Sequence, residues 1–419
     1  MIFSGFSKQA RVWLVAYLCL LIIYSIFSFS LTAPNLILIN TSWFESFQFW
    51  MWQTFFNNRV LLAQTYTVLI TLILICYALI ITSLKKEKAA ISFKQQVILI
   101  LFLSAPLLIS NNALSFDVFN YIFNSRMVWL YQANPHIRTA IEFPHDTWIR
   151  FMHNVHTPAP YGYGWTGLSL LPYIMGFRKF IITWLNFRLL SLISLILTSI
   201  TVSKTYQLLF KSNITLFHWS LVFINPLILI EIISNSHNDL WMIFPAVAGM
   251  ALLLWAKKFN NKKKFLYSCA GILAFIFSIS IKFATLALLP IYFLLMLDLM
   301  QLFKKSILSQ FIEKLLAHLP LLASLLMFLP LFTARSQQFH PWYLTWSLIW
   351  LPLIKNKYWR QALIAFSLTS LLRYVPWLIT NEYSSQVLTQ QKIITWSAPF
   401  LAGIYTLMTF AKDKFKIKA

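Results

Sequence analysis

Apolar residues form long runs that recur along the whole chain, separated by short polar segments. Most of the runs hold roughly 18–24 residues, enough for a helix to cross a hydrocarbon layer about 30 Å thick. We therefore predict an all-α, polytopic integral membrane protein with about 12–13 transmembrane helices. Residues 1–419 are expected to form a single membrane-embedded domain, with no soluble domain of useful size.

The expected spans can be placed along the sequence. They are residues 12–32, 62–84, 92–110, 181–203, 214–235, 239–256, 265–281, 283–303, 315–333, 343–354, 361–379 and 391–411. The run from Val12 to Leu31 is interpreted as a retained span, because it is long for a signal peptide and lacks a small-x-small cleavage site. The short stretch 163–177 is interrupted by glycine and proline, so we expect a re-entrant or interfacial segment there.

Charge refines this picture. Only 11% of the residues are charged, the mean hydropathy is +0.69, and the net charge is +23. The lysines cluster in short segments between apolar runs, at 85–88, 257–264, 304–305, 355–357 and 412–418. Such clusters mark cytoplasmic loops, so we expect cytoplasmic termini in an inner or plasma membrane of bacterial type. This placement explains the basic charge without a nucleic-acid partner.

The polar segments that remain are expected on the extracytoplasmic face. The longest is the main loop 111–162, and shorter ones occur at 34–61, 234–239, 334–342 and 380–390. Asp117 begins the main loop after the third span, and a helix over 117–131 would place Asn120, Tyr121 and Asn124 on its face. A carboxylate held there is a candidate general base; the alternative is a helix N-terminal acid that interacts with the helix dipole.

A second polar group is Asn235-Ser236-His237-Asn238-Asp239, which joins two apolar runs almost without a loop. Ionisable side chains at membrane depth are costly unless they are paired, and are therefore functional candidates. Glu231 lies one turn earlier and is a candidate for the same reason. The alternative interpretation is a hydrogen-bonded turn.

The third group is cationic. Lys282 interrupts an apolar run at the end opposite the lysine clusters, and Arg335 and His340 lie in the polar segment 334–342. Such cations could bind a lipid phosphate, whereas the alternative role is anchoring at the membrane surface. If Lys282 has no partner in the empty protein, its replacement by Met would raise stability.

Two other patterns have a possible functional meaning. Gly162, Gly164 and Gly167 fit a dinucleotide-binding fingerprint by letter, but no strand or βαβ unit accompanies them, so we reject that interpretation. The histidines of the main loop could bind metal with Asp146, but their spacing matches no standard site. They are His136, His145, His153 and His156. A divalent metal is thus compatible with the sequence but not implied, and the sequence specifies no cofactor.

A carboxylate facing cations at the membrane surface suggests chemistry on a lipid-linked phosphate, such as glycosyl transfer. Several short segments support this hypothesis by their order along the chain. They are Asp117-Val118-Phe119-Asn120-Tyr121, Asn134-Pro135-His136, Tyr161-Gly162-Tyr163-Gly164, Asn225-Pro226-Leu227, His237-Asn238-Asp239, Lys282-Phe283 with Pro290, and His340-Pro341-Trp342-Tyr343. The ordered set resembles the polyprenol-phosphate-mannose-dependent α-mannosyltransferases of the GT-C superfamily. His136 stands where that family has Tyr, and Tyr163 where it has Pro.

The resemblance implies a GT-C fold with a large extracytoplasmic first catalytic loop. It implies inverting transfer of a mannose-like hexose, from a polyprenyl-phosphate-sugar donor to a glycan or lipid acceptor, on the extracytoplasmic face among membrane lipids. Asp117 corresponds to the catalytic position. The expected substrate-binding residues are Tyr121, Asn134, Tyr161, His237, Asn238, Asp239, Lys282, Arg335, His340 and Tyr343.

Two alternative functions stay open at this stage. A transporter or flippase of a lipid-linked glycan would favour internal repeats and polar residues at the membrane midplane, and the sequence shows no repeat. A membrane scaffold would not need Asp117, His237 and Asp239 together on one face.

Overall fold

The computed structural model describes residues 5–32, 36–300, 307–333 and 339–416. These residues form helices and one isolated β-bridge between Ala90 and Thr215, with no strand among them. The all-α class predicted from the sequence is therefore confirmed.

Most of the described residues lie in helical segments. The α-helices are α1 (Lys8–Phe27), α2 (Ser42–Met51), α3 (Arg59–Leu84), α4 (Phe93–Leu108), α5 (Asp117–Tyr131), α6 (Tyr163–Ile174), α7 (Phe180–Phe210), α8 (Leu216–Phe223), α9 (Pro226–Ile228), α10 (Asp239–Ala256), α11 (Asn261–Ile281), α12 (Leu289–Met300), α13 (Ile307–Ala317), α14 (Leu319–Leu326), α15 (Thr345–Leu348), α16 (Lys357–Leu372), α17 (Val375–Thr380) and α18 (Ser385–Lys416). The 3₁₀ segments are η1 (Ser28–Leu31), η3 (Ala140–Glu142), η4 (Thr147–Phe151), η6 (Phe283–Leu288), η7 (Leu329–Phe332), η9 (Pro341–Leu344) and η10 (Leu351–Leu353), and the π-helices are η2 (Trp52–Phe56) and η5 (Leu229–Ser234).

Seven helical segments of the described chain are long and apolar enough to cross a membrane, or nine if each of two bent pairs is one span. The protein is thus a multi-pass membrane protein, with fewer such segments than the 12–13 expected. The difference has a local cause, because several expected spans are short, bent or broken. The span 92–110 is the 16-residue helix α4, 214–235 bends by 42° between α8 and α9, and 343–354 consists of η9, α15 and η10.

The bend between α8 and α9 follows from Asn225 and Pro226. Pro226 has no amide hydrogen to continue the ladder of α8, and the Asn225 side chain instead caps α9 by accepting a hydrogen bond from the amide of Leu227 at 2.9 Å. The segment then continues as the π-helix η5, a form often found at functional sites.

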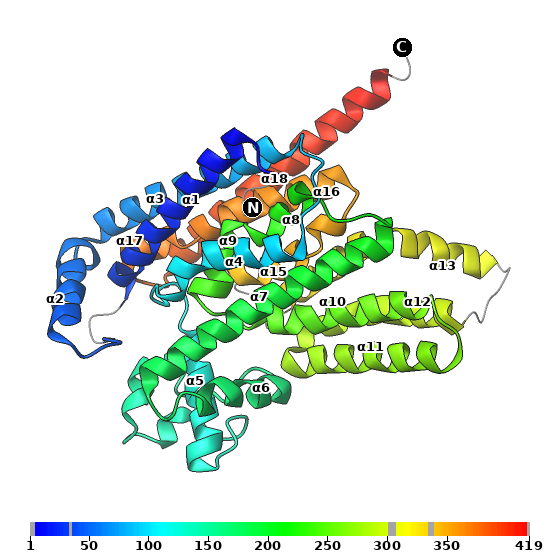
Figure 1. Ribbon diagram of the computed structural model, residues 1–419. Coiled ribbons are helices and arrows are strands. Elements are labelled where there is room, and N and C mark those ends of the chain that lie inside the picture. Colours follow the sequence, from blue (N-terminus) through cyan, green and yellow to red (C-terminus); the bar gives the residue numbers. More distant parts are fainter. Residues whose placement is uncertain (1–4, 33–35, 301–306, 334–338, 417–419) are drawn as a thin grey trace.

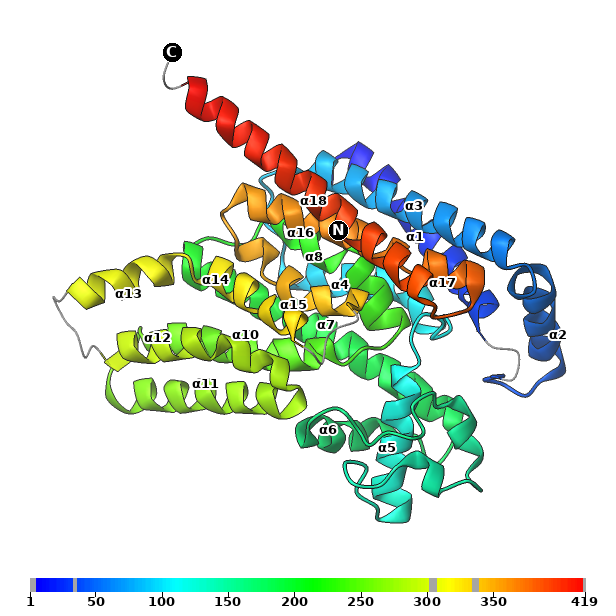
Figure 2. The ribbon, with the colours of Figure 1, turned by 180° about the vertical axis from the view of Figure 1, so that it is seen from behind.

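The helices are arranged so that one end of the bundle carries the main loop. Helices α5 and α6 form a group at one end of the long helix α7, whereas α13 lies at the other end (Figures 1 and 2). Helices α10 and α11 form a closely packed hairpin beside α7; a Cβ atom built on Gly249 would lie 2.5 Å from the carbonyl oxygen of Gly271. The C-terminal end of α11 reaches α6, so its lysine-rich N-terminal end points away from the main loop.

Helix α6 holds only 12 residues, which is too short to cross a membrane. This length agrees with the expectation of a segment that does not cross fully at 163–177. Two glycines of this segment allow close packing, because a Cβ on Gly164 would collide with Ser280 and one on Gly176 with Thr183, whereas a Cβ on Gly167 would meet no atom within 4 Å. The helix has no preceding strand in the described chain, as the rejected dinucleotide fingerprint would have required.

Candidate active site

A cavity of about 660 Å³ opens where the main loop meets α11 and η9. Five of the predicted site residues line it: Asp117, Tyr161, Lys282, His340 and Tyr343. They come from distant parts of the sequence, and only the tertiary structure brings them to one space. The remaining lining residues are mostly apolar and belong largely to η6 and η7.

Asp117 is the first residue of α5, which has the bounds of the helix considered for residues 117–131. Its carboxylate is partly exposed in the cavity, and the hydroxyl of Tyr161 donates a hydrogen bond to Oδ2 at 2.9 Å. Nδ1 of His237 lies 3.4 Å from the same oxygen. Burial by itself would raise the pKa of Asp117, but His237, Lys282 and Tyr161 outweigh it and hold that pKa below its ordinary value. Asp117 is therefore ionised at neutral pH.

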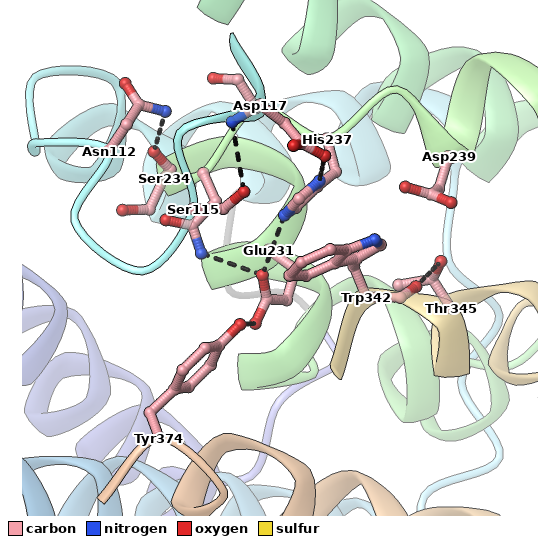
Figure 3. Close-up of polar contacts among 12 residues, drawn as sticks. Asn112, Ser115, Asp117, Glu231, Ser234, His237, Asp239, Trp342, Thr345 and Tyr374 are labelled. Atoms are coloured by element: carbon pink, nitrogen blue, oxygen red, sulfur yellow. Dashed lines mark hydrogen bonds and ion pairs between the residues drawn. The ribbon is translucent and has the colours of Figure 1, made fainter. Parts of the chain in front are cut away.

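His237 is fully buried behind Asp117, in the turn between η5 and α10. The turn is fixed by Ser236, whose φ of 59° is uncommon for a residue other than glycine, and by a hydrogen bond from the amide of His237 to the carbonyl of Glu231 at 3.2 Å. The imidazole stacks on Trp342, with ring centroids 3.9 Å apart, and Nε2 lies 3.5 Å from Oε2 of Glu231 (Figure 3).

Lys282 has a buried partner, contrary to the possibility that it is unpaired. Its ammonium donates a hydrogen bond to Oδ1 of Asp239 at 2.9 Å, and the indole nitrogen of Trp346 donates to the same oxygen. The ammonium also lies 5.5–5.8 Å from the ring centres of Tyr161, Tyr343 and Trp346, a range in which cation–π attraction acts. Asp239 does not line the cavity, but its partner Lys282 does.

Local backbone contacts explain why Tyr161 and Lys282 are neighbours. The amide of Gly162 donates a hydrogen bond to the carbonyl of Ile281 at 2.9 Å, which joins the end of the main loop to the last residue of α11. The absence of a side chain at Gly162 allows this approach.

A buried arginine ties together the two backbone segments that carry Asp117 and His237. The Arg188 guanidinium of α7 is fully buried and donates to the carbonyls of Leu107 and Ile233 and to Oδ1 of Asn112, at 2.7, 3.2 and 2.7 Å. Asn112 in turn donates to the carbonyl of Ser234 at 2.9 Å (Figure 3). These hydrogen bonds of the cation fix the spacing between the segment before α5 and the segment before α10.

Besides Asp239, four predicted site residues of the described chain lie outside the cavity lining. Tyr121 is buried and packs edge-to-face on Tyr161, with ring centroids 5.1 Å apart. His237 and Asn238 lie behind Asp117 and Lys282. Asn134 hydrogen-bonds to the exposed Tyr163 at 3.1 Å and is not brought to the cavity. Arg335 lies outside the described residues.

The histidines and the acid of the main loop do not gather into a metal site. Within the described ranges no group of three or more His, Cys, Asp or Glu side chains could hold a metal ion. Asp146 forms an ion pair with Arg126 and accepts a hydrogen bond from Tyr131 at 2.6 Å. His136 hydrogen-bonds to Thr166 at 2.8 Å, and His153 stacks on Phe116.

Two residues of the site, Trp346 and Tyr374, were not found from the sequence, and Trp342 was part of a family segment but was given no role. Trp342 and Trp346 are four residues apart, a helical spacing that could have indicated a shared face next to His340. Tyr374 donates a hydrogen bond to Oε1 of Glu231 at 2.9 Å across 143 residues of sequence, and no local sequence pattern predicts this contact.

Comparison with known proteins identifies the family. No curated protein and no solved structure matches the chain. A family model described as alpha-(1->6)-mannopyranosyltransferase, N-terminal domain, matches residues 20–298, which is more than half of the chain. This range holds Asp117, Tyr161, His237, Asp239 and Lys282. The chain belongs to this mannosyltransferase family, and it is therefore a membrane-embedded glycosyltransferase.

Proposed function

We propose that the protein transfers mannose from a polyprenyl-phosphate-linked donor to a hydroxyl group of a glycan or lipid acceptor, with inversion, on the extracytoplasmic face. The observation that carries this proposal is the composition of the cavity. It exposes a carboxylate, Asp117, and an ammonium, Lys282, and its remaining wall is mostly apolar. A donor with a charged phosphate and a long hydrocarbon tail needs charged groups and an apolar surface in the same site.

The transfer assigns one role to each charged group. Asp117 accepts the proton of the acceptor hydroxyl while the oxygen of that hydroxyl attacks C1 of the sugar. The bond between C1 and the phosphate oxygen breaks, and polyprenyl phosphate leaves with the electron pair. Lys282 lies where it can stabilise the negative charge that develops on that phosphate. The family description names an alpha linkage, and an α-linked product formed by inversion requires a β-linked donor.

The apolar wall suits a hydrocarbon tail. Phe283, Ala284 and Leu286 of η6 face the same space as Leu329 and Pro330 of η7. Phe283 and Leu329 are 58% and 56% exposed, so this wall continues toward the surface of the bundle. A polyprenyl chain entering there would leave its phosphate beside Lys282.

A donor assay tests the proposal directly. Purified protein reconstituted in nanodiscs is incubated with labelled β-linked polyprenyl-phosphate mannose, and in parallel with a labelled nucleotide-linked mannose. We expect transfer from the lipid-linked donor alone, because a water-soluble nucleotide sugar has no tail for the apolar wall. The anomeric configuration of the product is then determined by glycosidase digestion. Transfer from the nucleotide sugar in purified protein, or a β-linked product, would overturn the proposal.

The topology is a separate prediction. Helix α11 spans 21 residues, or about 30 Å at 1.5 Å per residue, so Lys262 and Lys282 belong to opposite ends of one span. We expect cysteines introduced at Lys262 to react only from the cytoplasm, and those at Glu142 or His340 only from outside. Membrane-impermeant maleimide, applied to intact cells and to inverted vesicles, makes the measurement. The background is a variant in which Cys19, Cys76 and Cys269 are replaced by serine. Reaction of positions 262 and 340 from the same side would contradict the topology.

A further inference from the structure

A row of buried polar groups extends from the cavity into the bundle. Asp117 faces His237, His237 faces Glu231, and Glu231 accepts hydrogen bonds from Tyr374 and Asn235, each at 2.9 Å (Figure 3). Glu231 and His237 are fully buried, and neither lines the cavity. The transfer step described above assigns no task to Glu231.

The geometry indicates the protonation state of His237. Its two ring nitrogens face carboxylate oxygens on opposite sides, Nδ1 toward Asp117 at 3.4 Å and Nε2 toward Glu231 at 3.5 Å. A neutral imidazole carries one lone pair, which would point at one of these carboxylates and be repelled. A doubly protonated ring satisfies both. The distances are long for hydrogen bonds, so the attraction depends chiefly on charge.

The contacts of Asp117 are divided unequally between its two oxygens. Both His237 and Tyr161 approach Oδ2, whereas Oδ1 accepts no hydrogen bond from the described residues. The carboxylate is therefore held by one oxygen, and the other is free to take a proton from an acceptor.

We infer that Glu231 is a positioning residue, which keeps His237 as an imidazolium so that the ring restrains Oδ2 of Asp117 and leaves Oδ1 for the acceptor hydroxyl. The consequence for catalysis rests on the proposed function, whereas the charge state of His237 does not. Burial would lower the pKa of His237, but Asp117 and Glu231 together raise it above its ordinary value, in agreement with the geometry.

Other titratable groups lie beside the row formed by Asp117, His237 and Glu231. His340, before η9, interacts electrostatically with His237 itself; Lys282 and Tyr161 act on Asp117, Tyr374 donates to Glu231, and Asp239 pairs with Lys282. Lys282 is paired with Asp239, which reduces its effect on His237. Burial lowers the pKa of His340 to about 4, so this neighbour is neutral over the pH range of the experiments.

The first experiment needs no substrate. The full-length protein, labelled with ¹⁵N at histidine side chains, is reconstituted in nanodiscs and titrated by NMR, with a His237→Gln variant to assign the signal. We expect His237 to be doubly protonated at pH 7. In Glu231→Gln, its pKa should fall by about 1–3 units, the usual effect of removing one close opposite charge. A neutral His237 at pH 7 in the wild-type protein would overturn the inference, whatever the donor proves to be.

The second experiment asks whether the charge matters for transfer. The pH dependence of the transfer rate is measured for wild type, Glu231→Gln, Glu231→Asp and Tyr374→Phe. If the imidazolium is needed, the alkaline limb of Glu231→Gln moves to lower pH by about the same 1–3 units. Glu231→Asp should restore most of the wild-type profile, and Tyr374→Phe, which keeps the charge, should not move it. An equal loss at every pH in Glu231→Gln would mean that Glu231 is only a packing residue.

Discussion

The Asp117→Asn variant is expected to fold, insert and bind donor, yet to transfer sugar about 10²–10⁴-fold more slowly, the usual cost of losing a general base. Asparagine has the same shape as aspartate and can still accept the hydrogen bond from Tyr161. It cannot take up a proton from the acceptor. The loss should therefore appear in the maximal rate, with little change in the donor concentration that gives half of that rate.

Glu142→Gln provides a matched control for Asp117→Asn. Glu142 is another acid of the main loop, but its side chain is exposed and its ion pair is with Arg138, four residues away. The same change from carboxylate to amide there should leave transfer within error of wild type. A well-folded Asp117→Asn variant with near-normal turnover would reduce Asp117 to an acid at the start of α5, where it interacts favourably with the helix dipole.

Lys282→Met is expected to lower both the stability of the protein and its use of donor. The Asp239 side chain is fully buried and the Lys282 side chain is only 17% exposed. Removing one partner of such a pair leaves an uncompensated buried charge and typically costs about 3–5 kcal/mol. This expectation has the opposite sign to that for an unpaired lysine. Thermal unfolding in detergent measures the stability, and the dependence of transfer on donor concentration measures the second effect.

The double variant Lys282→Met/Asp239→Asn separates these two effects. It removes both charges, so most of the lost stability should return. Donor saturation should remain impaired, because the ammonium that would face the phosphate is still missing. If the double variant instead regains normal donor saturation, Lys282 serves the fold alone. Unchanged stability in Lys282→Met would show that the pair with Asp239 contributes little.

Several local features could be derived from the sequence because they depend on neighbours along the chain. A helix over 117–131 would place Asp117, Asn120 and Tyr121 on one face, and α5 has these bounds. Seven expected spans overlap, over most of their length, with helical segments that are long and apolar enough to cross a membrane. The expected spans that became short or bent contain prolines such as Pro226 and Pro352, whose effect on helix length depends on what packs around them.

The sequence by itself determined the membrane character, the helical class and the family resemblance, because runs of apolar residues and short motifs are local properties. It also indicated which polar residues are candidates for a functional site, because a charged side chain at membrane depth is costly and must be paired by some other group. The partners themselves were decided by the tertiary structure. Asp239 pairs with Lys282 across 43 residues of sequence, and Tyr374 reaches Glu231 across 143. Asn134 matched a motif but is held beside Tyr163, away from the cavity. Whether a charge is paired or free depends on chain segments that meet only when the helices pack, and this contact decides its energy and its chemistry.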